Sequence, residues 1–358
     1  MKIAYLCYWN AYGRDGVVAK IEGQVSRWRV EGHAARIFAL SPPGAGKSFA
    51  DDVFTFESAR GRAAAGARLI RELEAFAPDL VYLRYDLFPP AVWRAVRRTP
   101  TVIEVNSDDR REWARRGVGG RAFNALNRRL VLGAAAGIVF VTRELAASPA
   151  FARYTRRRLV LGNGLDPGGV EALSAPANER PRLVFVGTPD HPWHGVDKIA
   201  DLARRMRGAD FDLVGPDPAM AGLPANATAH GLLERESYLP ILARADAALG
   251  TLAFHRNGMD EGSPLKVREY LLAGLPVVIG YEDTDFAGEE PWFLLRLPNT
   301  ESNVVENVSA IQAFVSRVRG RRVPRELVAD RVGTKAKEAA RLEFFERVLS
   351  DRRSRRSP

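Results

Sequence analysis

Two successive series of alternating apolar and amphipathic segments constrain the fold of this chain most strongly. The apolar segments have the length of strands, and the segments between them have helical periodicity. Such alternation is typical of parallel sheets covered by helices on both faces. In the first series the expected strands are Ile3–Cys7, Ala35–Leu40, Leu80–Leu83, Thr101–Val105, Gly137–Val141 and Leu159–Leu161, and the expected helices are Val17–Glu31, Ala63–Phe76, Pro89–Arg98 and Ala122–Leu132.

A polar segment with two prolines, Leu173–Pro181, reads as a linker to the second series. Expected strands there are Arg182–Val186, Phe211–Val214, Ala227–His230, Ala245–Leu249, Pro276–Ile279 and Phe293–Leu297, with helices Val196–Met206, Arg235–Arg244, Pro264–Leu272 and Val304–Arg319. We therefore expect an α/β protein of two doubly wound, Rossmann-like lobes with a ligand cleft at the carboxyl ends of the strands. The expected boundaries are 1–172 for the first lobe, 173–323 for the second, 324–350 for a last helix and 351–358 for a disordered basic tail.

The net charge and the cysteine content indicate the compartment and the partners to expect. The net charge is +10 and the only cysteine is Cys7, so a disulfide framework is excluded. The chain enters its first strand without a preceding signal-peptide run, and its longest low-charge stretch, Leu130–Thr142, is too short to cross a bilayer. We expect a cytoplasmic protein. The basic residues favour contact with the anionic inner face of the cytoplasmic membrane, and the alternative is that they have no specific partner. Nucleic acid is disfavoured because no fold motif for it is present.

The stretch Ser263–Gly274 has the sequence features of a helix whose first turn binds an anion. Ser263 is a natural N-cap, Pro264 suits the first helical position, and Gly274 is placed to end the helix. The backbone N–H groups of Leu265 and Lys266 would then lack helical partners, and the Lys266 ammonium adds positive charge beside them.

Two carboxylates flank this anion site. Glu269 lies four residues after Leu265, on the same helix face, and Glu261 precedes the helix in what reads as a loop. A bare phosphate would be repelled by two carboxylates, whereas a phosphate joined to a ribose or a sugar offers them hydroxyls. The pattern predicts a ligand of that kind.

The sequence Glu261-Gly262-Ser263-Pro264-Leu265-Lys266, closed by Ala-Gly-Leu-Pro-Val-Val, resembles the signature of family-4 glycosyltransferases. These are retaining enzymes of the two-lobed GT-B fold. The resemblance implies a nucleotide-diphosphate sugar in the second lobe, an acceptor in the first, and a last helix that returns to the first lobe. It also implies that no metal or other cofactor is required, and that the leaving phosphate, rather than a protein nucleophile, assists the incoming hydroxyl.

By the same resemblance, Glu261 would contact donor-sugar hydroxyls and Glu269 the ribose hydroxyls. The loop after strand Arg182–Val186 usually has an Arg after its first glycine and a Lys before its second, and here Thr188 and His194 stand at those positions. We infer that His194 takes part of the phosphate-binding role, with charge from Lys266 and Arg256. The donor-binding candidates are Gly187, Thr188, His194, Gly195, Arg256, Gly262, Ser263, Leu265, Lys266 and Glu269. His191 and His194 lack the further ligands of a metal site.

Acceptor-side candidates lie in the first lobe. Tyr12, Gly13, Asp15 and Gly16 belong to a loop between the first strand and its helix, where the family has a glycine-rich loop, and a plain turn is the alternative. Asn106 and Asp108 follow the strand that ends at Val105, where related enzymes often have a His-Asp pair. They are candidates for orienting the acceptor hydroxyl and join Glu261 as catalytic candidates. The alternative for Asp108 is a helix N-cap.

One other similarity is rejected, and two other functions stay open. Ser41–Ser48 looks like a P-loop, but its first glycine is replaced and the following residues, Asp52–Phe56, read as a strand. Asn163–Asp166 resembles the turn that ends the first lobe in the family. We expect a glycosyltransferase of cell-envelope or exopolysaccharide synthesis. The alternatives are a GT-B nucleotide-sugar epimerase and a non-catalytic binding protein, the latter favoured by Thr188 and His194.

Overall fold

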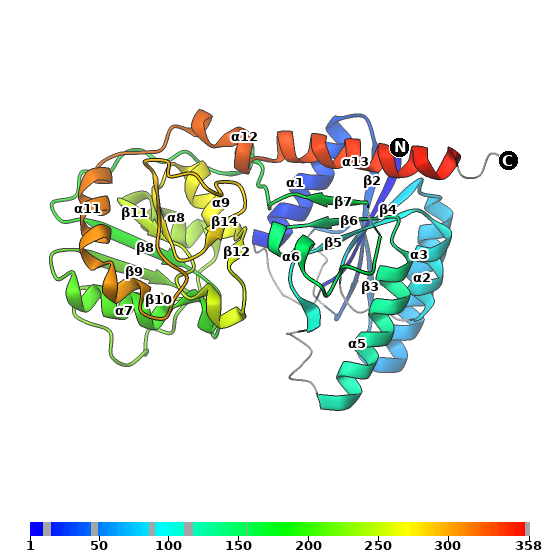
Figure 1. The fold of residues 1–358 in the computed structure, drawn as a ribbon, viewed down its shortest axis with the longest axis horizontal. Helices are drawn as coiled ribbons and strands as arrows, with labels where there is room; N and C mark the ends of the chain where they lie inside the picture. Colours follow the sequence, from blue (N-terminus) through cyan, green and yellow to red (C-terminus); the bar gives the residue numbers. More distant parts are fainter. Residues whose placement is uncertain (10–15, 44–48, 86–89, 111–116, 156, 355–358) are drawn as a thin grey trace. The chain divides into compact units, whose positions relative to one another are not determined.

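The computed structural model describes residues 1–9, 16–43, 49–85, 90–110, 117–155 and 157–354 (Figure 1). The chain divides into two compact units, with unit 1 formed by Met1–Gly162 and Thr334–Pro358 and unit 2 by Asn163–Gly333. The division comes before the expected boundary at 172 because Leu165 is buried in the core of unit 2 and its N–H bonds to the Val332 carbonyl.

Unit 1 contains a seven-stranded sheet in which all neighbouring strands are parallel, in the order β3-β2-β1-β4-β5-β6-β7. Its strands are β1 (Lys2–Tyr8), β2 (Ala34–Ser41), β3 (Asp52–Thr55), β4 (Leu80–Arg84), β5 (Thr101–Val105), β6 (Gly137–Phe140) and β7 (Arg158–Val160). Its helices are α1 (Gly16–Val30), α2 (Ala59–Phe76), α3 (Pro90–Arg98), α5 (Gly117–Val131), α6 (Arg143–Ala147) and α13 (Thr334–Ser354), with the 3-10 turn η1 (Leu132–Ala134).

The residues of β1 show why this sheet is covered on both faces. Ile3, Tyr5 and Cys7 share a buried cluster with residues of α1 and α13. Ala4 and Leu6 are equally buried, and successive strand side chains point to opposite faces, so they face the other side. The helix expected near the C-terminus thus packs on unit 1. The expected disordered tail is wrong for its first residues, because α13 continues to Ser354 and Asp351 pairs with Arg157 at 2.9 Å.

Unit 2 contains a six-stranded parallel sheet in the order β10-β9-β8-β11-β13-β15, and a separate two-stranded pair, β12-β14. The strands are β8 (Arg182–Val186), β9 (Asp210–Val214), β10 (Ala227–Gly231), β11 (Ala247–Leu249), β12 (Glu261–Gly262), β13 (Val277–Ile279), β14 (Glu282–Asp283) and β15 (Leu294–Arg296). The helices are α7 (Val196–Arg205), α8 (Arg235–Arg244), α9 (Leu265–Ala273), α10 (Asn303–Glu306), α11 (Val308–Val318) and α12 (Ala329–Val332), with 3-10 turns η2 (Pro167–Gly169), η3 (Pro192–His194), η4 (Phe254–Asn257) and η5 (Arg325–Leu327).

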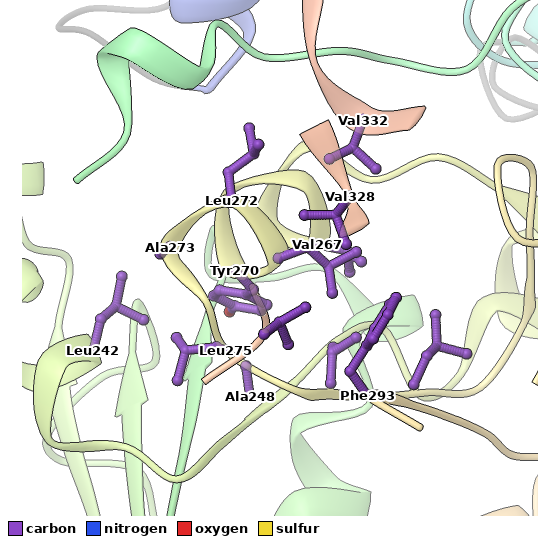
Figure 2. Packing of buried hydrophobic residues seen from close by; sticks show 14 of the residues in the cluster. Leu242, Ala248, Val267, Tyr270, Leu272, Ala273, Leu275, Phe293, Val328 and Val332 are labelled. Atoms are coloured by element: carbon purple, nitrogen blue, oxygen red, sulfur yellow. The ribbon is translucent and has the colours of Figure 1, made fainter. Parts of the chain in front are cut away.

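Two buried clusters cover the two faces of this sheet. Leu183 and Phe185 of β8 pack with α7 and α11, whereas Val184 between them packs with α8, α9 and α12. Figure 2 shows the second cluster, in which Val267 and Tyr270 of α9 lie among apolar side chains from β11, from α12 and from Phe293, which immediately precedes β15. Helix α9 is therefore fixed along one side by the core.

The expected helix Val304–Arg319 is two helices in the structure. Asn307 separates α10 from α11, and its Nδ2 donates to the Asn303 carbonyl at 2.7 Å. Among the described residues, no helix is long and apolar enough to cross a membrane.

Candidate functional site

The strand order of unit 2 reverses between β8 and β11, and the loops that follow these strands define the candidate site. In open α/β sheets, ligands bind outside the carboxyl ends of the strands at such a point. The two loops are joined directly, since the N–H groups of Leu252 and Ala253 donate to the carbonyls of His194 and Trp193 at 3.2 and 3.1 Å.

Gly187, the first residue after β8, leaves a space that other groups approach. A Cβ at this position would lie 2.5 Å from Phe185 Cζ and 2.9 Å from both His194 Nδ1 and Lys266 Nζ. No side chain fits there without displacing them. A histidine and a lysine that lie far apart in the sequence thus come together at Gly187.

Helix α9 begins one residue later than expected. Its N-cap is Pro264, with ψ of 133°, and the helix starts at Leu265. Ser263 cannot cap it because its Oγ accepts a hydrogen bond of 2.7 Å from the Asn163 N–H, while Asn163 Nδ2 donates to the Ser263 carbonyl at 2.6 Å. The predicted helix end is confirmed, with Gly274 at φ of 93°.

Lys266 presents an enclosed amine at the start of α9. Its Nζ has no hydrogen-bond partner among the described residues and lies 4.2 Å from the centre of the Phe185 ring. Burial lowers the pKa of Lys266 to about 7. An amine in this setting gains much from an anionic partner.

His194 ends the turn η3 and is buried beside Lys266. Its Nδ1 also has no hydrogen-bond partner among the described residues. Burial, followed by the charge of Lys266, lowers the pKa of His194 to about 3, so the imidazole is neutral near pH 7. Gly195 follows at φ of 74°, which allows the turn to lead directly into α7.

Glu269 is held by two residues of α8 that sequence reasoning missed. It accepts hydrogen bonds from Arg235 Nε at 2.9 Å and from the Tyr238 hydroxyl at 3.1 Å, and its side chain is 13% exposed. Arg235 and Tyr238 are three residues apart on one predicted helix face, but nothing in their sequence surroundings marked them.

Glu261 lies in a strand rather than in the expected loop. It belongs to β12, which pairs in parallel with β14, and it is buried. Gly262 permits this packing, because a Cβ there would lie 2.9 Å from the Phe254 ring.

Arg256, one of the donor-binding candidates, forms ion pairs within the protein. It forms ion pairs with Asp197, at 2.7 Å, and with Glu301, and its Nη1 donates to the Pro192 carbonyl at 3.1 Å. We assign this side chain to joining the turns η3 and η4.

In unit 1, the candidate Asn106 belongs to a buried charged cluster. Asn106 Nδ2 donates to Glu104 at 3.3 Å, and Lys20 Nζ lies 2.8 Å from Glu104 and 3.4 Å from Asn106 Oδ1. Arg341 of α13 lies 3.6 Å from the same carboxylate. Sequence reasoning missed Lys20, Glu104 and Arg341, since buried charges carry no signature of their own.

Only some of the remaining first-lobe candidates lie within the described residues. Asp108 Oδ1 accepts a hydrogen bond of 3.1 Å from the Arg110 N–H, as expected for the helix N-cap alternative. Gly16 begins α1, whereas Tyr12, Gly13 and Asp15 lie outside the described residues, as does most of the P-loop-like stretch. Within the described part of the chain, no group of three or more His, Cys, Asp or Glu side chains could hold a metal ion.

Comparison with known proteins links this geometry to a fold. No family model matches the sequence. Its structure is similar to that of sucrose-phosphate synthase from Thermosynechococcus elongatus, with a TM-score of 0.67 and 12% sequence identity. The match covers 98% of this chain and 100% of that one. It also matches Anabaena HepE, solved in complex with UDP and glucose, at a TM-score of 0.63 and 15% identity over 97% of this chain and 99% of that one. The chain has the GT-B fold.

A sequence comparison also finds a glycosyltransferase that is similar to part of this chain. The 2-deoxystreptamine glucosyltransferase of Streptomyces kanamyceticus is 29% identical over 255 residues. The match spans 63% of this GT-B chain and 64% of the relative.

Proposed function

We propose that this chain is a glycosyltransferase that moves a sugar from a nucleotide-diphosphate sugar to an acceptor hydroxyl. The observation that carries the proposal is the convergence of Lys266 Nζ and His194 Nδ1 above Gly187, both buried and without hydrogen-bond partners among the described residues. They lie at the strand-order reversal of unit 2, beside the start of α9. A diphosphate supplies the charge and the acceptor atoms that this arrangement lacks.

The residues of the candidate site have separate proposed roles, which depend on their positions. The Lys266 ammonium and the first N–H groups of α9 stabilise the charge that develops on the leaving diphosphate, and such stabilisation is strongest where water is excluded. The Glu269 carboxylate, oriented by Arg235 and Tyr238, accepts hydrogen bonds from the ribose hydroxyls. Glu261 accepts hydrogen bonds from the donor sugar.

In keeping with the family-4 resemblance, the proposed reaction retains the anomeric configuration and uses neither a metal nor a protein nucleophile. The leaving phosphate oxygen takes the proton of the incoming hydroxyl as the new glycosidic bond forms. Asn106, oriented by Glu104 and Lys20, is the proposed contact for the acceptor. Asp108 remains a candidate for the same role.

Two acceptor classes are supported by different observations. The sequence resemblance favours a glycan or lipid-linked acceptor of envelope or exopolysaccharide synthesis. The name of the Streptomyces relative favours a small polar acceptor, an aminocyclitol. Transfer assays with both classes distinguish them.

Contact with the inner face of the cytoplasmic membrane is part of the proposal, and α5 is the element that supports it. Val118, Phe123 and Leu126 are 75%, 40% and 48% exposed, and the exposed Arg121 and Arg129 lie on the same helix, which contains no acidic residue. Flotation with vesicles containing an anionic lipid should recover the wild type, and Leu126→Glu should reduce recovery. Equal recovery on neutral vesicles would contradict the charge-based contact.

A thermal-shift screen tests the donor site. UDP, GDP, ADP, CMP and their sugar conjugates are compared on the wild type, on Glu269→Gln, and on Glu236→Gln as a control at an exposed position of α8. A ligand at about a hundred times its dissociation constant adds roughly 2.7 kcal/mol to stability, or a few degrees. We expect a shift with one base that is lost only in Glu269→Gln.

The alternatives give different results in the same experiment. Absence of any nucleotide shift would favour the non-catalytic binding protein. Conversion of a nucleotide sugar to its isomer in the absence of an acceptor, detected by chromatography, would favour the epimerase.

A further inference from the structure

Arg268, which lies between Lys266 and Glu269 in the sequence of α9, is a fully buried cation. Both of its Nη atoms bind Asp283, with 2.8 Å between Nη2 and Oδ1, and Nη2 also binds Asp285. Its Nε donates to the Asn163 carbonyl at 3.3 Å. One guanidinium therefore connects α9 to two other segments of unit 2, the one that contains Asp283 and Asp285 and the one that contains Asn163.

The first of these segments holds Glu261 in place. Asp283 belongs to β14, which pairs with β12, the strand of Glu261. The Glu282 N–H donates to the Asp260 carbonyl at 2.8 Å, and the Thr284 N–H donates to the Gly262 carbonyl at 3.0 Å. The peptide groups on both sides of Glu261 are thus bonded to the segment that Arg268 anchors.

Asn163 holds the next residue of the same stretch. It binds Ser263 twice, through its N–H and its Nδ2, and Ser263 joins β12 to Pro264 at the start of α9. The guanidinium of Arg268 therefore contacts both groups of residues that fix the path of the chain from Glu261 to Ser263.

We infer that Arg268 is a positioning residue that sets Glu261 relative to Lys266 and Glu269, so that the site recognises the sugar of the donor as well as its nucleotide. The inference rests on the proposed function and deepens it. Lys266 and Glu269 lie on α9 itself, whereas Glu261 lies on a two-residue strand with little core of its own. Binding one ligand with groups on both elements requires a rigid connection between them.

Calorimetry on the full chain tests this, with UDP and UDP-glucose as probes, or the GDP or ADP pair if the thermal-shift screen selects that base. In Arg268→Lys, the single ammonium cannot span Asp283, Asp285 and Asn163 at once. We expect the dissociation constant for the free nucleotide to change by less than about twofold. The nucleotide sugar should bind about tenfold more weakly, and its hydrolysis should slow by a similar factor.

Arg325→Lys is the matched control. Arg325 likewise has three partner residues in unit 2, donating to the carbonyls of Leu272, Pro167 and Val170, but among the described residues it forms no hydrogen bond or ion pair with the Glu261 segment. It should leave the ratio of the two dissociation constants unchanged. A double-mutant cycle completes the test, since Arg268→Lys should have little further effect in Glu261→Gln.

Asp285→Asn removes one carboxylate from Arg268 and serves if Arg268→Lys does not fold. Equal weakening of both probes, or additive effects in the cycle, would overturn the positioning role and leave a general structural one. If the wild type binds no nucleotide at all, the proposed function fails, and this inference fails with it. If the wild type binds both probes and Arg268→Lys binds them unchanged, only this inference fails.

Discussion

The Tyr270 hydroxyl accepts a hydrogen bond of 2.7 Å from the Val186 N–H. Tyr270 directly follows Glu269 on α9, and Val186 directly precedes Gly187. This contact joins the helix of Glu269, the proposed donor-binding carboxylate, to the loop above which Lys266 and His194 converge.

Tyr270→Phe should destabilise unit 2 by about 1–3 kcal/mol, because the partly buried Val186 N–H loses its partner. Denaturant unfolding followed by fluorescence measures the change. Tyr5→Phe is the control, since the Tyr5 hydroxyl is equally buried but has no hydrogen-bond partner among the described residues. A similar loss in both variants would show that the Val186 contact contributes nothing specific.

Lys266→Met should abolish the nucleotide-induced thermal shift without lowering the melting temperature of the free protein. The enclosed amine has no hydrogen bond among the described residues, so replacing it by an apolar group removes a desolvation cost. Lys198→Met is the matched substitution with the opposite expectation. Lys198 Nζ donates to the carbonyls of Leu252 and Thr300 and to Asn303 Oδ1, and its loss should cost about 2–4 kcal/mol. A large drop in melting temperature for Lys266→Met would contradict the unpaired state of its amine.

Nucleotide affinity should fall as the pH rises from 7 to 9. Burial lowers the pKa of Lys266 to about 7 in the free protein, and a bound diphosphate raises that pKa because it favours the charged amine. Binding therefore takes up a proton above pH 7, and the dissociation constant should rise by up to about tenfold per pH unit.

Calorimetry in buffers of different ionisation enthalpy measures the proton uptake. Lys266→Arg should bind with little pH dependence in this range, since a guanidinium stays charged. Equal pH profiles for the wild type and this variant would remove Lys266 as the linked group.

The stability of the free protein should change in the opposite direction over the same range. The unfolded chain binds a proton at Lys266 up to its ordinary pKa of 10.5, while the folded chain releases it near 7. The contribution of Lys266 to stability is therefore least favourable below pH 7 and rises with pH between these values. Lys266→Met should remove this part of the pH dependence from the unfolding free energy.

Glu104→Gln should destabilise unit 1 by about 3–5 kcal/mol, because Lys20 and Arg341 would lose the buried carboxylate that both of them contact. The surrounding cations hold the pKa of Glu104 well below its ordinary value, so its stabilising contribution persists in mild acid and is lost only as the pH falls through the folded-state pKa. Urea unfolding at neutral pH and in mild acid checks both statements. Glu74→Gln, at a surface pair with Arg98, should change stability by less than about 1 kcal/mol.

The two parallel sheets and the end of helix α9 could be predicted from the sequence. Alternating apolar segments placed the strands, because a strand buried on both faces must be apolar throughout. Gly187 and Gly274 were found because close approach and positive φ require glycine. Glu261, Lys266 and Glu269 were found because a helix start flanked by carboxylates has a recognisable local pattern.

Only the tertiary structure decided which charged groups are already satisfied. Lys198 and Lys266 both follow a predicted loop into a helix, yet one amine has three partners and the other has none among the described residues. Arg256 looked available and is paired, while Arg268 carried no signal and joins segments as distant in sequence as Asn163. A side chain's partners are set by contacts between remote segments, and the local periodicities that reveal strands and helices do not encode them.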